Sequence, residues 1–87
     1  MENEPYEAIH TNNDGVVTET AVIFNGKRYE TTNTGTGATL GYAELVSNNE
    51  LKVFDAKEFF IGTGKNLTDF DSRGISDSIA YHLIIRN

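Results

Sequence analysis

The fold follows from one stretch of sequence, VVTETAVIFNGKRYETT at residues 16–32. Two runs rich in β-branched residues flank the central pair Asn25-Gly26, and β-branched side chains favour strands. Asn-Gly between two such runs is a strong hairpin signal, because both residues tolerate the positive φ angles of a two-residue turn. The stretch therefore predicts a β-hairpin with its turn at Asn25-Gly26.

A two-residue turn also fixes which side chains share a face of this hairpin. Phe24 would then face Lys27, and Val22 would face Tyr29. Because side chains alternate between the two faces of a strand, Val22, Phe24 and Tyr29 would lie together. We predict that the face they share is the core side.

Further strands are expected on both sides of the hairpin. Residues 6–11 alternate loosely in polarity, and the turn formers at residues 12–15 connect them to the next strand. This arrangement predicts a three-stranded meander. Residues 42–46 and 51–54 flank a polar stretch and are typical of a second hairpin. The first of these two segments also suits a helix, since residues 43–45 read Ala-Glu-Leu.

One short helix is expected at residues 55–62. Asp55 can cap its first turn, and Glu58 follows three residues later, as a capping box requires. Gly62 can end the helix in a left-handed turn. We expect this helix to pack on the sheet, because so short a helix is not stable by itself.

The last segment, residues 79–86, is apolar on both faces. Burial on both faces is typical of a central strand, and the β-branched and aromatic content of the segment favours the same structure. The alternative is a helix that begins at a Ser76 or Asp77 cap. The fold expected for residues 1–87 is thus a single α+β domain, mostly β: an antiparallel sheet of five or six strands with one short helix.

The composition excludes several classes of function. The 87 residues include 13 acidic and seven basic side chains, no cysteine, and a net charge of −6. An acidic field repels phosphate backbones, so we expect no direct nucleic-acid binding. Without cysteine there is no disulfide and no thiolate metal site, and we expect neither a metal nor a cofactor. No stretch approaches a membrane span, and residues 1–4 are acidic where a signal peptide is basic, which predicts a cytoplasmic protein.

Acidic side chains crowd two parts of the chain and are the expected partner-binding residues: Glu2, Glu4, Glu7, Asp69, Asp71 and Asp77. If both groups lie on one face, they form an anionic patch that can occupy a basic surface of another protein. An inhibitor of a host nucleic-acid-handling or defence complex, encoded by a virus or another mobile element, fits this description. An uncovered sheet edge would also favour a homodimer.

A glycine-rich stretch supports an alternative function. Thr34, Gly35, Thr36 and Gly37 form a loop whose backbone N–H groups could hold a phosphate, as in a nucleotide-sequestering protein. The next glycine is Gly41, which lies one residue too far for a dinucleotide fingerprint. The more conservative interpretation is a plain connecting loop.

Catalysis is the least favoured class. A triad could be assembled from Ser76, Asp77 and His82, but almost any sequence offers such a trio. Asp69 and Asp71 resemble the start of a calcium loop, yet the later ligand positions of an EF-hand are not filled. We therefore expect a binding protein and no enzyme.

Overall fold

The computed structural model describes residues 5–47, 50–65 and 72–85. These residues form six strands, one α-helix and a closing π-helical turn: β1 (Tyr6–Thr11), β2 (Val17–Phe24), β3 (Tyr29–Asn33), β4 (Thr39–Ser47), β5 (Glu50–Asp55), β6 (Phe60–Lys65), α1 (Ser72–Ala80) and η1 (Tyr81–Ile85). The strands make one antiparallel sheet in the order β1-β2-β3-β4-β5-β6, so every strand pairs with its neighbour in the chain. The expected fold class, mostly β with one short helix, is confirmed.

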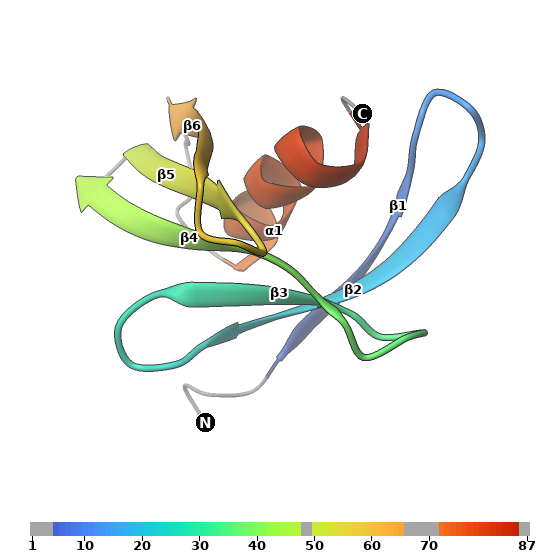
Figure 1. Ribbon diagram of the computed structural model, residues 1–87, viewed down its shortest axis with the longest axis horizontal. Helices are drawn as coiled ribbons and strands as arrows, with labels where there is room; N and C mark the ends of the chain where they lie inside the picture. Colours follow the sequence, from blue (N-terminus) through green and yellow to red (C-terminus); the bar gives the residue numbers. More distant parts are fainter. Residues whose placement is uncertain (1–4, 48–49, 66–71, 86–87) are drawn as a thin grey trace.

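The helix lies inside the curve of the sheet, between the β1–β2 ribbon and strands β4–β6 (Figure 1). It packs on the face that carries Val22, Ala43 and Val53, which we call the inner face. The opposite side of the sheet is the outer face. The described helix covers only the inner face, so side chains on the outer face are not covered by it. The candidate site lies on the outer face.

The β2–β3 hairpin forms where it was predicted, but its turn is longer. Phe24 pairs with Tyr29 and not with Lys27, so residues 25–28 make the turn. The side-chain Oδ1 of Asn25 accepts the N–H groups of Lys27 and Arg28, and these bonds stabilise the wider turn. This shift of the register by two residues leaves each side chain on the face predicted for it. Val22 is therefore buried on the inner face, and Tyr29 packs against the core beside Phe24, as predicted.

The second predicted hairpin is confirmed as β4–β5, which settles the strand-or-helix ambiguity of residues 42–46. Tyr42 pairs with Phe54, and Ala43 pairs with Val53. The first strand of the meander is also confirmed as β1, which pairs with β2 along its whole length. Five antiparallel pairings between consecutive strands therefore make up the described sheet.

The helix predicted at residues 55–62 is wrong. This segment is the tight β5–β6 turn followed by the start of β6. Asp55 Oδ1 accepts the N–H groups of Lys57 and Phe59, both at 2.9 Å. A helix cap and this turn make the same kind of side-chain hydrogen bond to nearby N–H groups. Asp55 therefore makes bonds of the kind predicted, but in a turn and not at the start of a helix. Glu58 adopts φ 70°, which closes the turn.

The strand favoured for residues 79–86 is also wrong over residues 79–85, and residue 86 lies outside the described residues. The helical alternative is correct, although α1 begins earlier, at Ser72. Ile75 and Ile79 stand one helical turn apart, and both are fully buried against the inner face. These two side chains complete the core with the inner-face residues of the sheet. Packing across the concave sheet outweighs the modest β propensity of the segment.

Candidate protein-binding surface

The outer face of the β1–β2 ribbon exposes acidic and apolar side chains together. Glu7, Ile9, Val17 and Glu19 are all exposed, and Ile9 keeps 68% of its accessible surface. Ile9 pairs directly with Glu19, while Glu7 is the next outer-face residue along β1. Because alternate residues of a strand share a face, the two carboxylates flank Ile9. We call these four side chains the acidic face.

A hollow of about 330 Å³ borders the acidic face. Its lining consists of Glu7, Ala8, Ile9, Glu19, Thr20 and Thr34. Thr34 comes from the β3–β4 turn, which is tied to β2 by a hydrogen bond from the Thr34 N–H to the Glu19 carbonyl. The hollow therefore has fixed walls contributed by β1, β2 and a turn.

The carboxylates of the acidic face differ from those of the other outer-face cluster. Arg28 lies 2.8 Å from Glu58 and 3.9 Å from Glu44, and its guanidinium stacks on the Tyr42 ring. The hydrogen bond from Arg28 lowers the pKa of Glu58, and the same bond raises the pKa of Arg28. Within the described part of the chain, no such cation lies beside Glu7 or Glu19. Their charge is thus available to a partner.

The structure brings only part of the predicted acidic patch together. Glu7 points from the outer face, whereas Asp77 is exposed on α1, which covers the inner face, and lies 3.9 Å from Arg73. The sheet separates these two carboxylates. The remaining four predicted residues lie outside the described residues: Glu2, Glu4, Asp69 and Asp71.

Glu19 belongs to the acidic face and was missed from the sequence. The signal was present, because Glu19 alternates with Thr18 and Thr20 in a predicted strand and so falls on the face opposite Val22. Finding it required the register of β1 against β2, which pairs it with Ile9. Charge clustering along the sequence could not reveal a pair formed across two strands.

The predicted ligand loop at residues 34–37 has its backbone N–H groups already engaged. Two of them donate to the side-chain Oδ1 of Asn33, and a third donates to the Asn33 carbonyl at 2.7 Å. The fourth donates to the Glu19 carbonyl, as described above. A phosphate would have to displace these bonds. The described loop is therefore a turn whose N–H groups are bonded to protein oxygens, whereas a phosphate-binding loop needs N–H groups that are free to bind the phosphate.

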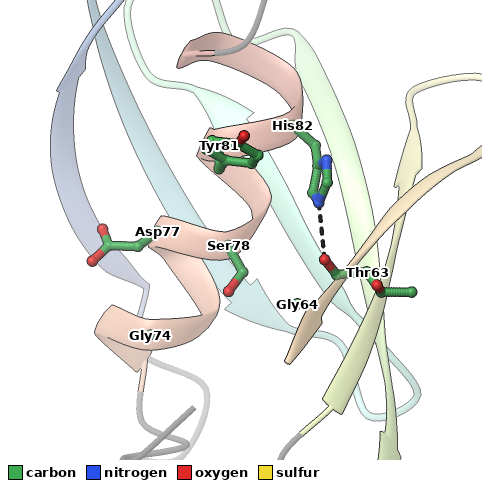
Figure 2. A pocket seen from close by; sticks show the side chains of 7 residues that line it. All are labelled: Thr63, Gly64, Gly74, Asp77, Ser78, Tyr81 and His82. Carbon is green, nitrogen blue, oxygen red and sulfur yellow. Dashed lines mark hydrogen bonds between the residues drawn. The ribbon is translucent and has the colours of Figure 1, made fainter. Parts of the chain in front are cut away.

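A second hollow, of about 320 Å³, lies between the helix and β6 (Figure 2). His82 Nε2 donates to the Thr63 carbonyl at 3.1 Å, and the ring stands directly over Gly62. A Cβ at Gly62 would lie 2.3 Å from the ring, and a Cβ at Gly64 would lie 2.8 Å from Ser78 Oγ. The two glycines therefore allow the helix to approach β6 closely.

The trio Ser76, Asp77 and His82 is not arranged for catalysis. The Ser76 hydroxyl is buried and lies 3.4 Å from His10 Nε2, which ties α1 to β1. His82 bonds the β6 backbone, and Asp77 faces solvent. These contacts give each polar group of the trio a different environment.

Known proteins give no functional information on this chain. The chain matches no protein-family model, no curated protein and no solved structure. Among the described residues, no group of three or more His, Cys, Asp or Glu side chains could hold a metal ion. In the same part of the chain, no helix is long and apolar enough to cross a membrane.

Proposed function

We propose that this chain is a small protein-binding module that uses the acidic face to occupy a basic surface of another protein. The observation that carries the proposal is the pair Glu7 and Glu19, which flank the exposed Ile9 beside a hollow of about 330 Å³. Neither carboxylate is neutralised within the described residues. An apolar centre with charged neighbours is a common anatomy of protein interfaces.

The net charge of −6 supports the same proposal. A charge of this sign steers association toward a basic partner and sets the orientation of approach more than the final affinity. Lys and Arg side chains of the partner would pair with Glu7 and Glu19, while Ile9 and Val17 would supply apolar contact. A partner that handles nucleic acid has such a basic surface, so inhibition of a host nucleic-acid-handling or defence complex in the cytoplasm remains our proposal for the biological role.

Affinity capture from a lysate of the source or host organism tests this proposal. The bait is the tagged wild-type chain, compared with Glu19→Lys at the acidic face and with Asp77→Lys on α1. Both substitutions change the net charge equally, and both positions are exposed. We expect a partner with a basic surface that is captured at low salt and released at high salt.

The purified partner then gives the decisive comparison. The Kd of the partner for Glu19→Lys should be at least about tenfold higher than its Kd for the wild type, because the reversed charge faces a cation of the partner. Asp77→Lys should bind like the wild type. Equal affinities of the wild type and Glu19→Lys would refute the acidic face as the docking surface.

A further inference from the structure

The hydrogen-bond pattern of β1 leaves one edge of the sheet open. The Asn12 N–H donates to the Val16 carbonyl at 3.0 Å, so residues 12 and 16 form the hydrogen-bonded pair next to the β1–β2 turn. Hydrogen-bonded and non-hydrogen-bonded pairs alternate along an antiparallel ladder. Ala8 and His10 therefore bond to β2, and Glu7, Ile9 and Thr11 direct their N–H and C=O groups away from it.

Two of the residues with these outward backbone groups, Glu7 and Ile9, also belong to the acidic face. The side chains of Glu7, Ile9 and Thr11 lie on the outer face, and all are exposed. A strand that pairs with this edge would place alternate side chains next to Ile9, on the outer face. There they would come within reach of the carboxylates of Glu7 and Glu19.

The other edge of the sheet is less open. At the middle of β6, the Thr63 carbonyl accepts a hydrogen bond from His82 Nε2, and the helix stands over this strand (Figure 2). In β1, no described side chain donates to the backbone of Glu7, Ile9 or Thr11. The β1 edge is thus the better site for an added strand.

We infer that β1 accepts an extended basic segment of the partner protein, which pairs with the β1 edge and carries Lys or Arg at alternate positions. The backbone bonds would provide affinity, and the carboxylates of Glu7 and Glu19 would select the basic side chains. This inference rests on the proposed function. A second copy of the chain is a poorer occupant, because β1 reads YEAIHT and offers an acidic residue but neither Lys nor Arg.

The geometry sets the expected pattern of hydrogen bonds in a test peptide. In a hydrogen-bonded antiparallel pair, the two opposed side chains lie on the same face. The Lys residues of a peptide that alternates Lys and Thr would therefore lie opposite Glu7, Ile9 and Thr11 and direct their own N–H groups toward β1. The N–H groups of the Thr residues would point away from β1.

Two N-methylated versions of this capped Lys-Thr peptide test the inference by fluorescence anisotropy at low salt. Methylation of the Lys amides removes the bonds to β1 and should weaken binding to the wild-type chain at least about tenfold. Methylation of the Thr amides is the matched control and should have little effect. An equal response to the two methylated peptides would overturn strand addition.

Variants of the chain provide a second, independent measurement. Ile9→Pro removes an outward N–H and no ladder bond, whereas Ile9→Ala removes the side chain and keeps that N–H. We expect Ile9→Pro to bind the unmethylated peptide more weakly than Ile9→Ala, with circular dichroism confirming that both are folded. Equal binding by the two variants would contradict the inference.

The same assay separates failure of this inference from failure of the proposed function. Glu19→Lys should weaken peptide binding whether or not strands pair at β1, because the substitution replaces a carboxylate that attracts the Lys side chains of the peptide by a cation that repels them. Loss with Glu19→Lys but an equal response to the two methylated peptides would leave the acidic face in place and reject strand addition. A dimer of the free chain that Ile9→Pro dissociates, measured by light scattering, would assign the edge to a second copy and overturn the inference.

Discussion

At the scale of single residues, the spacing between the helix and β6 depends on the missing side chain of Gly62. The His82 ring occupies the place where a Cβ would stand, with its Cε1 atom at 2.3 Å from that position. The ring is itself 9% exposed and is fixed by its bond to the Thr63 carbonyl. Neither partner can move without breaking this bond or opening the core.

The substitution Gly62→Ala should therefore destabilise the chain by about 1–3 kcal/mol, the usual cost of overpacking a close contact. Urea denaturation measures this change. The same substitution in a His82→Ala background should cost less, because the ring that meets the new methyl group is gone. Additive effects of the two substitutions would show that the contact does not limit the packing.

Residue-scale features of the acidic face were only partly predictable. Glu7 was predicted from sequence as a partner-binding residue. Glu19 could be found only from the strand register that places it opposite Ile9. Asp77 was grouped with Glu7 because both are acidic, yet the sheet lies between them. Charge can be counted in a sequence, but the face on which a charge lies depends on the pairing of distant segments.

At the scale of elements, the turns of the β2–β3 and β5–β6 hairpins are held together by one ion pair. Arg28 reaches from the first turn to Glu58 in the second, at 2.8 Å. Glu58 adopts φ 70°, a left-handed backbone conformation that is uncommon for a residue with a side chain. The hydrogen bond from Arg28 lowers the pKa of the Glu58 carboxyl.

This pair predicts a pH-dependent contribution to stability. A carboxyl whose pKa is lowered by folding stabilises the native state above the ordinary Glu pKa of about 4.3, and the contribution is lost as the pH falls through the lowered value. The urea midpoint of Glu58→Gln should thus lie below that of the wild type at neutral pH. The two midpoints should converge in acid.

Because Glu58 is exposed and Arg28 is only partly buried, the difference at neutral pH should be small and should shrink as salt is added. Glu19→Gln is the matched control, since Glu19 has no ion-pair partner among the described residues. Its urea midpoint should differ little from that of the wild type at any of these pH values. A gap for Glu58→Gln that persists in acid would contradict an origin in the ion pair.

Strands were easier to predict from sequence than the helix. Asn25-Gly26 located the central hairpin because turn chemistry is local, although the bonds of Asn25 widened the turn. Asp55 bonds to nearby N–H groups in a turn much as it would in a helix cap, so local chemistry could not separate the two. The spacing of Ile75 and Ile79 does indicate a helix, but this signal begins before residue 79, ahead of the segment for which a strand was predicted.

At the scale of the whole molecule, stability depends on the helix filling the concave side of a single sheet. Ile79 is completely buried against inner-face residues that include Leu51 and Val53. A chain of 87 residues has a small core, so each of these contacts carries a large share of the total stability.

The substitution Ile79→Ala should reduce the free energy of unfolding by about 2–5 kcal/mol, because it leaves a cavity in the centre of the core. The exposed Ile9 provides the control, and Ile9→Ala should change the same quantity by no more than about 0.5 kcal/mol. Chemical denaturation measured by circular dichroism gives both values. Similar costs at the two positions would mean that the helix contributes little to the core.

The order of the elements along the chain also has a consequence for synthesis. Each strand pairs with the strand just made, so the sheet can grow hairpin by hairpin as the chain emerges from the ribosome. The segment that covers its apolar side, α1 and η1, emerges after all six strands. During that interval the nascent sheet exposes Val22, Leu51 and Val53 to solvent, and such exposed apolar surface favours aggregation and chaperone binding until the helix docks.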